Sequence, residues 1–187
     1  GDDREMLREH VKILQAIQCS GEISGRKKLQ KMIYIAKKLH FPFEEKFAFH
    51  FYGPYSEELT LQLEELINMG FVNEVKEKKG NYFQYCYSLT ETGTEFIKAF
   101  GNKENPRLSY CLKKMNEKTP RFLELVSTIL YFESLPKEQL VEKIFRVKSK
   151  QRYTLEEIDE ALEYIESLRE IAAPMDEEEA VSQLAES

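Results

Sequence analysis

Residues 26 to 71 read RKKLQKMIYIAKKLHFPFEEKFAFHFYGPYSEELTLQLEELINMGF, and this stretch decides the fold. Its first part spaces apolar residues as on one face of a helix, so residues 25 to 40 are predicted to be helical with that face in a core. The residues on this face are Leu29, Met32, Ile33, Ala36 and Leu39. The opposite face is cationic.

A strand is expected after this helix. Pro42 cannot continue a helix, because its ring clashes with the preceding turn and it has no amide proton to donate. From Lys46 the chain alternates with a period of two, which predicts a strand half buried by its phenylalanines. Those phenylalanines are Phe47, Phe49 and Phe51.

A turn and a second helix complete the stretch. The residues Tyr52, Gly53, Pro54 and Tyr55 have the composition of a turn, since Pro fixes one backbone angle and Gly tolerates conformations that other residues avoid. Ser56 is expected to cap the next helix, which ends at Gly70. The residues of its core face are Leu59, Leu63, Leu66 and Ile67.

Two family resemblances rest on these residues. The helix LQKMIYIAKK, an aromatic strand and FYGPYSEEL resemble the proximal half of the Panacea or SocA-type antitoxin domain, over about a third of the chain. This resemblance implies an interaction module that neutralises a toxin or presents it to a protease, without catalysis. The whole chain resembles the YwgA-like proteins of Bacillus and its relatives more closely still, and that family has no assigned activity.

Composition limits the classes of function. The 187 residues are 42% apolar and can bury one substantial core or two small ones. At a net charge of −6 the protein does not attract polyphosphate as a whole, so nucleic-acid binding would need a local basic patch. No apolar run approaches the roughly 20 residues of a membrane span, and we expect a cytoplasmic protein. The three cysteines lack metal-ligand spacing, so neither metal nor cofactor is expected.

A helix over residues 2 to 18 and a hairpin flank the central stretch. The strands of the hairpin are predicted at 71 to 76 and 82 to 89, around a polar loop with Gly80. One face of the second strand is aromatic and is expected to anchor the hairpin in the core, and its residues are Phe83, Tyr85, Tyr87 and Leu89. Thr90 is a natural N-cap for a following helix.

The order of three helices, a hairpin and the motif Y-x-L-T-x-x-G at residues 87 to 93 resembles winged-helix regulators of the MarR and PadR kind. That resemblance implies DNA binding and, by analogy, a homodimer. The fold is therefore predicted to be mainly α with a small β-hairpin or sheet. Residues 1–101 would form a winged-helix-like domain, 102–172 a helical bundle and 173–187 an acidic flexible tail.

No catalytic residues are predicted. His10, His40 and His50 lie far apart in the sequence, without a carboxylate or cysteine at ligand spacing. Adjacent glutamates on a helix diverge by about 100 degrees, so the Glu pairs of the chain do not form an acid and base couple. The sequence also has no P-loop and no G-x-G-x-x-G motif.

The predicted function is that of an adaptor or regulator that binds a protein. In a winged-helix domain the helix before the wing lies in the major groove, but residues 56 to 69 have no Lys or Arg and several Glu, which disfavours groove docking. Leu61 lies among these glutamates, either in a contact face or packed under the second region. The 52 to 55 turn is either a binding corner or a simple connection. The predicted protein-binding residues are Tyr52, Gly53, Pro54, Tyr55, Glu58, Leu61 and Glu65.

Two alternatives stay open. A DNA-binding regulator would grip phosphates through a basic wing and helix, and its residues would be Arg26, Lys27, Lys31, Lys76, Lys78 and Lys79. A small-molecule sensor would use an aromatic pocket near Phe49, Tyr85 and Tyr87.

Overall fold

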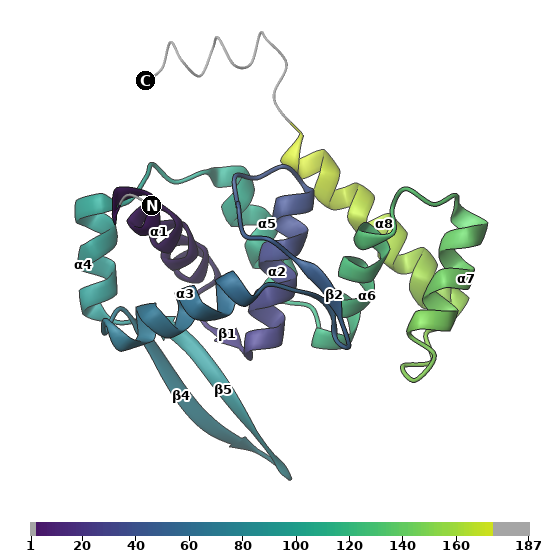
Figure 1. The fold of residues 1–187 in the computed structure, drawn as a ribbon, viewed down its shortest axis with the longest axis horizontal. Coiled ribbons are helices and arrows are strands. Elements are labelled where there is room, and N and C mark those ends of the chain that lie inside the picture. The colour runs from purple at the N-terminus through teal and green to yellow at the C-terminus, as the bar shows by residue number, and fades with distance from the viewer. Residues whose placement is uncertain (1–2, 174–187) are drawn as a thin grey trace, which may run out of the picture.

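The computed structural model describes residues 3–173, which are mainly helical with two small sheets, as predicted (Figure 1). Residues 174–187 of the predicted acidic tail lie outside the described residues. The helices are α1 (Asp3–Ser20), α2 (Arg26–Lys38), α3 (Glu57–Asn68), α4 (Glu91–Phe100), α5 (Pro106–Asn116), α6 (Pro120–Tyr131), α7 (Lys137–Val147) and α8 (Leu155–Ala172). The strands are β1 (Ile23–Ser24), β2 (Ala48–His50), β3 (Gly53–Tyr55), β4 (Val72–Lys79) and β5 (Tyr82–Leu89).

Within the described part of the chain, no helix combines the length and the apolarity that crossing a membrane requires.

Side-chain caps begin several helices at the positions that the sequence predicts. Ser56 Oγ accepts a hydrogen bond from the backbone N–H of Leu59 at the start of α3. Thr90 and Thr119 cap α4 and α6 in the same way, and Thr154 begins α8 with a full capping box. Each cap satisfies a backbone N–H that has no partner inside its helix, which fixes where the helix begins.

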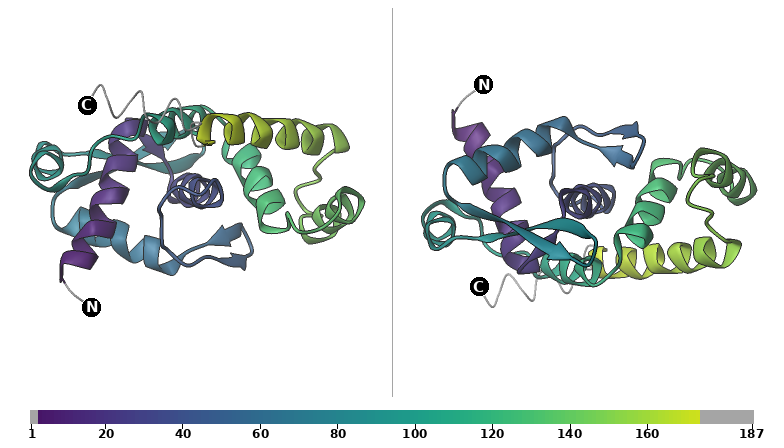
Figure 2. Two further views of the ribbon diagram at one scale, coloured as in Figure 1. Left: turned by 90° about the horizontal axis from the view of Figure 1, so that it is seen from above. Right: turned by 90° about the horizontal axis from the view of Figure 1, so that it is seen from below.

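α2 is the central helix of the fold. Figure 2 shows it nearly end-on in dark blue with other elements around it, and α5, α6, β1 and β3 all pack against it. Its residues from Leu29 to Ala36 are buried without interruption, Gln30 and Lys31 included. The prediction of an exposed cationic face is therefore wrong for Lys31, because the middle of α2 has no solvent side.

One hydrophobic cluster extends across residue 101. It includes Ile33 of α2, Leu112 of α5 and Val126 of α6, all of them fully buried. The contacts of α2 with α5 and α6 join the two regions that were predicted as domains. The division at residue 101 stays a prediction.

The β4–β5 hairpin extends away from the helices (Figure 1). It forms an antiparallel sheet of order β1-β5-β4, in which Ile23 pairs with Tyr87. Tyr87 is buried at the root of the hairpin, but Phe83 is 59% exposed and Tyr85 is 42% exposed. The predicted anchoring of the whole aromatic row is wrong, because the hairpin is longer than the surface on which it packs.

β2 and β3 form a second, two-stranded antiparallel sheet. Phe49 pairs with Pro54 and His50 with Gly53, so the turn falls at Phe51 and Tyr52 rather than at residues 52 to 55. The prediction that Phe51 helps to bury the strand is wrong, because a turn residue has no layer of the fold above it and its side chain is 66% exposed.

Truncating the centre of the core should cost a large part of the stability. Ile33→Ala is expected to lower the free energy of unfolding by about 2–5 kcal/mol, because it removes buried methylene groups and leaves a cavity. Leu61→Ala is the matched control on an exposed residue and is expected to change it by less than about 0.5 kcal/mol. Both changes are measured by urea unfolding, with circular dichroism as the signal. Equal losses of stability would contradict the placement of Ile33 in the core and of Leu61 on the surface.

Candidate protein-interaction site

The tip of the β2–β3 hairpin presents two aromatic side chains to solvent. Phe51 and Tyr52 form the turn, and their rings meet edge to face at 5.1 Å. Both side chains are exposed. Gly53 follows with φ +89°. This backbone conformation favours glycine, because in other residues the Cβ atom would clash with the backbone. The hairpin thus places its aromatic tip on a sharply turned backbone.

Two buried lysines hold the backbone of this tip. Lys148 Nζ donates to the carbonyl oxygen of Phe51 at 2.9 Å and to Glu124 Oε1 at 2.8 Å. Lys31 Nζ donates to the carbonyl oxygen of Pro54 at 2.7 Å. Lys31 and Lys148 are only 3% and 2% exposed. Their ammonium groups therefore hold the hairpin from its buried side, Lys148 at the turn and Lys31 at β3.

Beneath the turn, two lysines face one carboxylate. Lys31 and Lys148 both interact with Glu124, so the positive charges outnumber the negative one. Burial lowers the pKa of Lys31 to about 8; nearby Glu124 opposes this shift, whereas Lys148 and Lys27 add to it. A buried ammonium group is costly unless it is paired and hydrogen-bonded. The backbone carbonyls of the turn supply part of that compensation, so turn and lysines stabilise each other.

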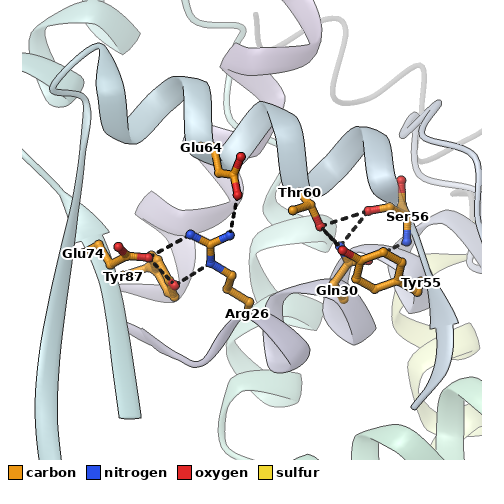
Figure 3. Close-up of polar contacts among 8 residues, drawn as sticks. All are labelled: Arg26, Gln30, Tyr55, Ser56, Thr60, Glu64, Glu74 and Tyr87. Atoms are coloured by element: carbon orange, nitrogen blue, oxygen red, sulfur yellow. Dashed lines mark hydrogen bonds and ion pairs between the residues drawn. The ribbon is translucent and has the colours of Figure 1, made fainter. Parts of the chain in front are cut away.

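A second contact from α2 fixes the junction of β3 and α3 (Figure 3). Gln30 Nε2 donates to the carbonyl oxygen of Ser56, and the N–H of Ser56 donates to Gln30 Oε1, both at 2.8 Å. The hydroxyl of Tyr55 lies 2.7 Å from that of Thr60 in α3. The hairpin and the first turn of α3 are thereby joined to one buried side chain.

A third contact from α2 fixes the root of the β4–β5 hairpin (Figure 3). Arg26 donates from Nε to the hydroxyl of Tyr87 at 2.9 Å and from its terminal nitrogens to Glu64 and Glu74 at 3.0 Å each. Burial raises the pKa of Tyr87 to about 12, and the hydrogen bond that its hydroxyl donates lowers the pKa of Glu74. Arg26 is thus bonded to three side chains of the protein while its own side chain stays 38% exposed, and its predicted contact with phosphate stays a prediction.

The predicted protein-binding residues of α3 lie in different settings. Leu61 is 57% exposed, so it belongs to the surface and is not packed under the second region. Glu58 is also exposed, and its carboxylate accepts a hydrogen bond from the backbone N–H of Lys46. Glu65 Oε2 lies 2.7 Å from His10 Nε2 and is thus partly engaged with α1. Leu61 and Glu58 share the outer side of α3.

The predicted DNA-binding cations divide into two groups. Lys27, Lys76 and Lys78 are exposed. Lys79 pairs with Glu77 at 3.4 Å, and Lys31 is buried beneath the turn, which contradicts its predicted contact with phosphate. Lys27 Nζ lies 3.2 Å from the centre of the Tyr52 ring, so one predicted cation touches the aromatic tip.

The structure does not assemble the aromatic pocket that was predicted as a sensor site. Phe49 packs against Tyr131 and Phe132 at 5.1 and 5.2 Å between ring centres. Tyr85 and Tyr87 line a groove beside α2 of which Phe49 is not a part. The three residues therefore do not enclose one cavity.

One group of side chains in the described residues has metal-ligand distances. A carboxylate oxygen of Glu22, one of Glu77 and Cys86 Sγ lie within 4.8 Å of one another. Burial raises the pKa of the Cys86 thiol, which donates to Glu77 at 3.4 Å. Glu22 is exposed, and acidic groups on a protein surface commonly lie this close together without an ion, so no metal centre is inferred from this group.

Lys148 and Glu124 are the site residues that sequence patterns missed. Lys148 lies 97 residues along the chain from the carbonyl that it contacts, and hydrophobic periodicity carries no signal over that distance. Gln30 was also missed, because a polar residue beside a core stripe is usually solvated.

Comparisons with known proteins place the chain beside one curated relative. It is 62% identical over 166 residues to a protein of Bacillus subtilis (strain 168) described as uncharacterized protein YwgA. The alignment covers 89% of this chain and 99% of the relative. No family model matches the chain. The description of the relative names no substrate, ligand or partner.

Lys31→Met should remove a pH dependence of stability. The pKa of Lys31 is about 8 in the folded protein, below the ordinary lysine value of 10.5, so the unfolded chain binds more protons between these two pH values. The free energy of unfolding therefore gains a contribution that rises with pH across this window, by up to about 3 kcal/mol. Urea unfolding of wild type and variant at pH 7.5 to about 9.5 measures this contribution as the difference between their free energies of unfolding. The titratable groups that both proteins contain cancel in that difference.

Lys98→Met is the control, because Lys98 is exposed on α4 and should leave the pH dependence unchanged. Parallel pH profiles for wild type and Lys31→Met would show that Lys31 is solvated and would refute its hold on the hairpin.

Proposed function

This chain belongs to the YwgA family, and on that premise we propose that it is a non-enzymatic protein-interaction module, an adaptor or regulator of the antitoxin kind. One observation carries the proposal: the exposed aromatic tip of Phe51 and Tyr52 stands on a backbone that two buried lysines hold in place. The partner is a protein that covers this tip.

The energetics of the tip favour a binding role. Buried lysines destabilise a fold unless they are well paired, and a turn that merely connects β2 to β3 does not need them. A fixed backbone lowers the conformational entropy that a partner must remove on binding. Exposed Tyr and Phe side chains on such a backbone have the composition of the centre of a protein interface.

The proposed contact surface continues onto α3. The hydrogen bond of Tyr55 to Thr60 and the bonds of Gln30 to Ser56 tie the hairpin to the start of this helix. The exposed Leu61 and Glu58 then add an apolar contact and a polar rim to the aromatic tip. Gly53, Pro54 and the engaged Glu65 support this surface rather than form its exposed part.

A winged-helix-like scaffold is part of the proposal. The order α1, β1, α2, α3, β4 and β5, with a sheet of order β1-β5-β4, supports it. The β2–β3 hairpin stands between α2 and α3 of that order, where it adds the aromatic tip.

DNA is the second candidate partner, and the exposed Lys27, Lys76 and Lys78 are the observation that favours it. Three phosphate contacts predict a slope of about −3 when the logarithm of the binding constant for duplex DNA is plotted against that of the salt concentration. We expect weak binding of this kind at low salt. A slope of about −6 or steeper, abolished by charge reversal of the three lysines, would favour the DNA-binding regulator instead.

The double variant Phe51→Asp and Tyr52→Asp should lose the protein partner while keeping its fold. Charged side chains at the tip would have to be desolvated on binding, so we expect capture of the partner to fall by about tenfold or more. Quantitative mass spectrometry of proteins captured from the native cytosol measures this. The free energy of unfolding should change by less than about 0.5 kcal/mol, because both side chains are exposed.

Phe145→Asp is the matched control, since Phe145 is an exposed aromatic residue on α7. It should capture the same proteins as the wild type, and Leu61→Asp should resemble the tip variant. Identical capture by the wild type and the tip variant would refute the proposed surface.

A further inference from the structure

The wing leaves part of one strand edge unpaired. On the side opposite β4, β5 pairs only with β1, which covers Tyr87 and Cys86. The backbone N–H of Gly25 adds one hydrogen bond to the carbonyl oxygen of Tyr85 at 2.7 Å, and α2 then turns the chain away. In an antiparallel ladder alternate residues point their N–H and C=O groups to the same edge, so those of Phe83 face the same side as those of Tyr85. Within residues 3–173 no strand occupies that edge beside Phe83.

This open edge borders a groove. It is lined by residues 82 to 85 of β5 and by residues 24 to 28, which run from the end of β1 into α2, and Pro120 also contributes to the lining. The groove has a volume of about 680 Å³. Tyr82, Phe83 and Tyr85 are all exposed around it. An extended peptide can lie in such a groove as an additional strand, with its side chains against the aromatic rings.

The groove is cationic. Lys27 and Lys28 give the lining its positive charge, because Arg26, which also lines the groove, is paired with Glu64 and Glu74. Glu74 is the acidic residue of the lining, and it is paired with Arg26 at 3.0 Å. Lys76, opposite Tyr85 in the register, lies with its Nζ 4.3 Å from the centre of the Phe83 ring. These charges are complementary to an anionic ligand.

We propose that this groove binds an extended acidic segment of the protein partner, which pairs with the open edge of β5 as an added strand. The inference rests on the proposed function and specifies the chemistry of the partner. A strand edge offers a backbone donor and acceptor in the spacing of another peptide, which a phosphodiester chain does not match. Lys27 lines the groove and also covers Tyr52, so a partner seated on the aromatic tip reaches the groove directly.

The test uses the full chain and a fluorescein-labelled peptide of about ten alternating Glu and Val residues. Binding of the peptide is measured by fluorescence anisotropy. Phe83→Pro removes the outward N–H and, because this N–H points away from β4, keeps the β4–β5 ladder. Lys78→Pro is the matched control, since Lys78 lies opposite Phe83 and its N–H faces the other edge of the hairpin. We expect Phe83→Pro to weaken binding by about tenfold or more and Lys78→Pro to bind within about threefold of the wild type.

Amide exchange in the wild-type chain gives a second readout that does not depend on how the proline variant folds. The Phe83 amide should exchange at least about tenfold more slowly in the presence of saturating peptide, because it becomes hydrogen-bonded. Lys27→Glu should weaken peptide binding about tenfold, whereas Lys98→Glu on exposed α4 should not change it.

Four outcomes would overturn the inference. The first is equal peptide binding by the wild type and Phe83→Pro, and the second is an unchanged exchange rate at Phe83. The third is tighter binding of a fluorescein-labelled oligothymidylate that Phe83→Pro leaves intact, which would assign the groove to nucleic acid. Loss of capture by the Phe51 and Tyr52 variant together with no peptide binding would refute the groove alone, and the proposed function would stand.

Discussion

The middle of α2, from Leu29 to Ala36, is buried on every side and has no solvent in which to place polar side chains, and this constraint organises the rest of the structure. Arg26, Gln30 and Lys31 each find their partners in a different surface element. Arg26 holds the root of the β4–β5 hairpin and Gln30 holds the start of α3 (Figure 3). Lys31 holds the turn of the β2–β3 hairpin. Since all three arise from one rigid helix, the elements that carry the exposed aromatic residues are held at fixed relative positions.

In the same arrangement, the residues that stabilise the fold differ from those of the proposed binding surface. Apolar packing around α2 supplies the hydrophobic free energy, whereas the polar contacts add little net stability and mainly determine position. The aromatic side chains at the tip of the β2–β3 hairpin and along the outer part of the β4–β5 hairpin contribute little to the core because they are exposed. A surface of this kind can change its specificity by substitution at the tip without loss of the fold, as loops on rigid scaffolds generally do.

The sequence predicted the helices and strands better than it predicted which of their side chains are buried. Local chemistry identified Ser56 and Thr154 as caps, and apolar spacing identified the core faces, because both depend on neighbours within a few residues. Lys31, Phe51 and Phe83 were placed wrongly, since periodicity indicates which side of an element is apolar but not how far the neighbouring layer extends. Within the candidate site, Leu61 was recognised as a residue off the core stripe, whereas the contact of Lys148 with Phe51 depends on tertiary structure alone.

The distance along the chain between the turn and its anchor also has a consequence for biosynthesis. Lys148 follows Phe51 by 97 residues, and Glu124 is made well after the hairpin. At about 5–20 residues per second, the ribosome needs seconds to produce these partners after the hairpin has emerged. The aromatic tip therefore reaches its final position only when α6 and the residue that follows α7 have left the exit tunnel, so a nascent chain cannot yet present the proposed binding surface in its final form.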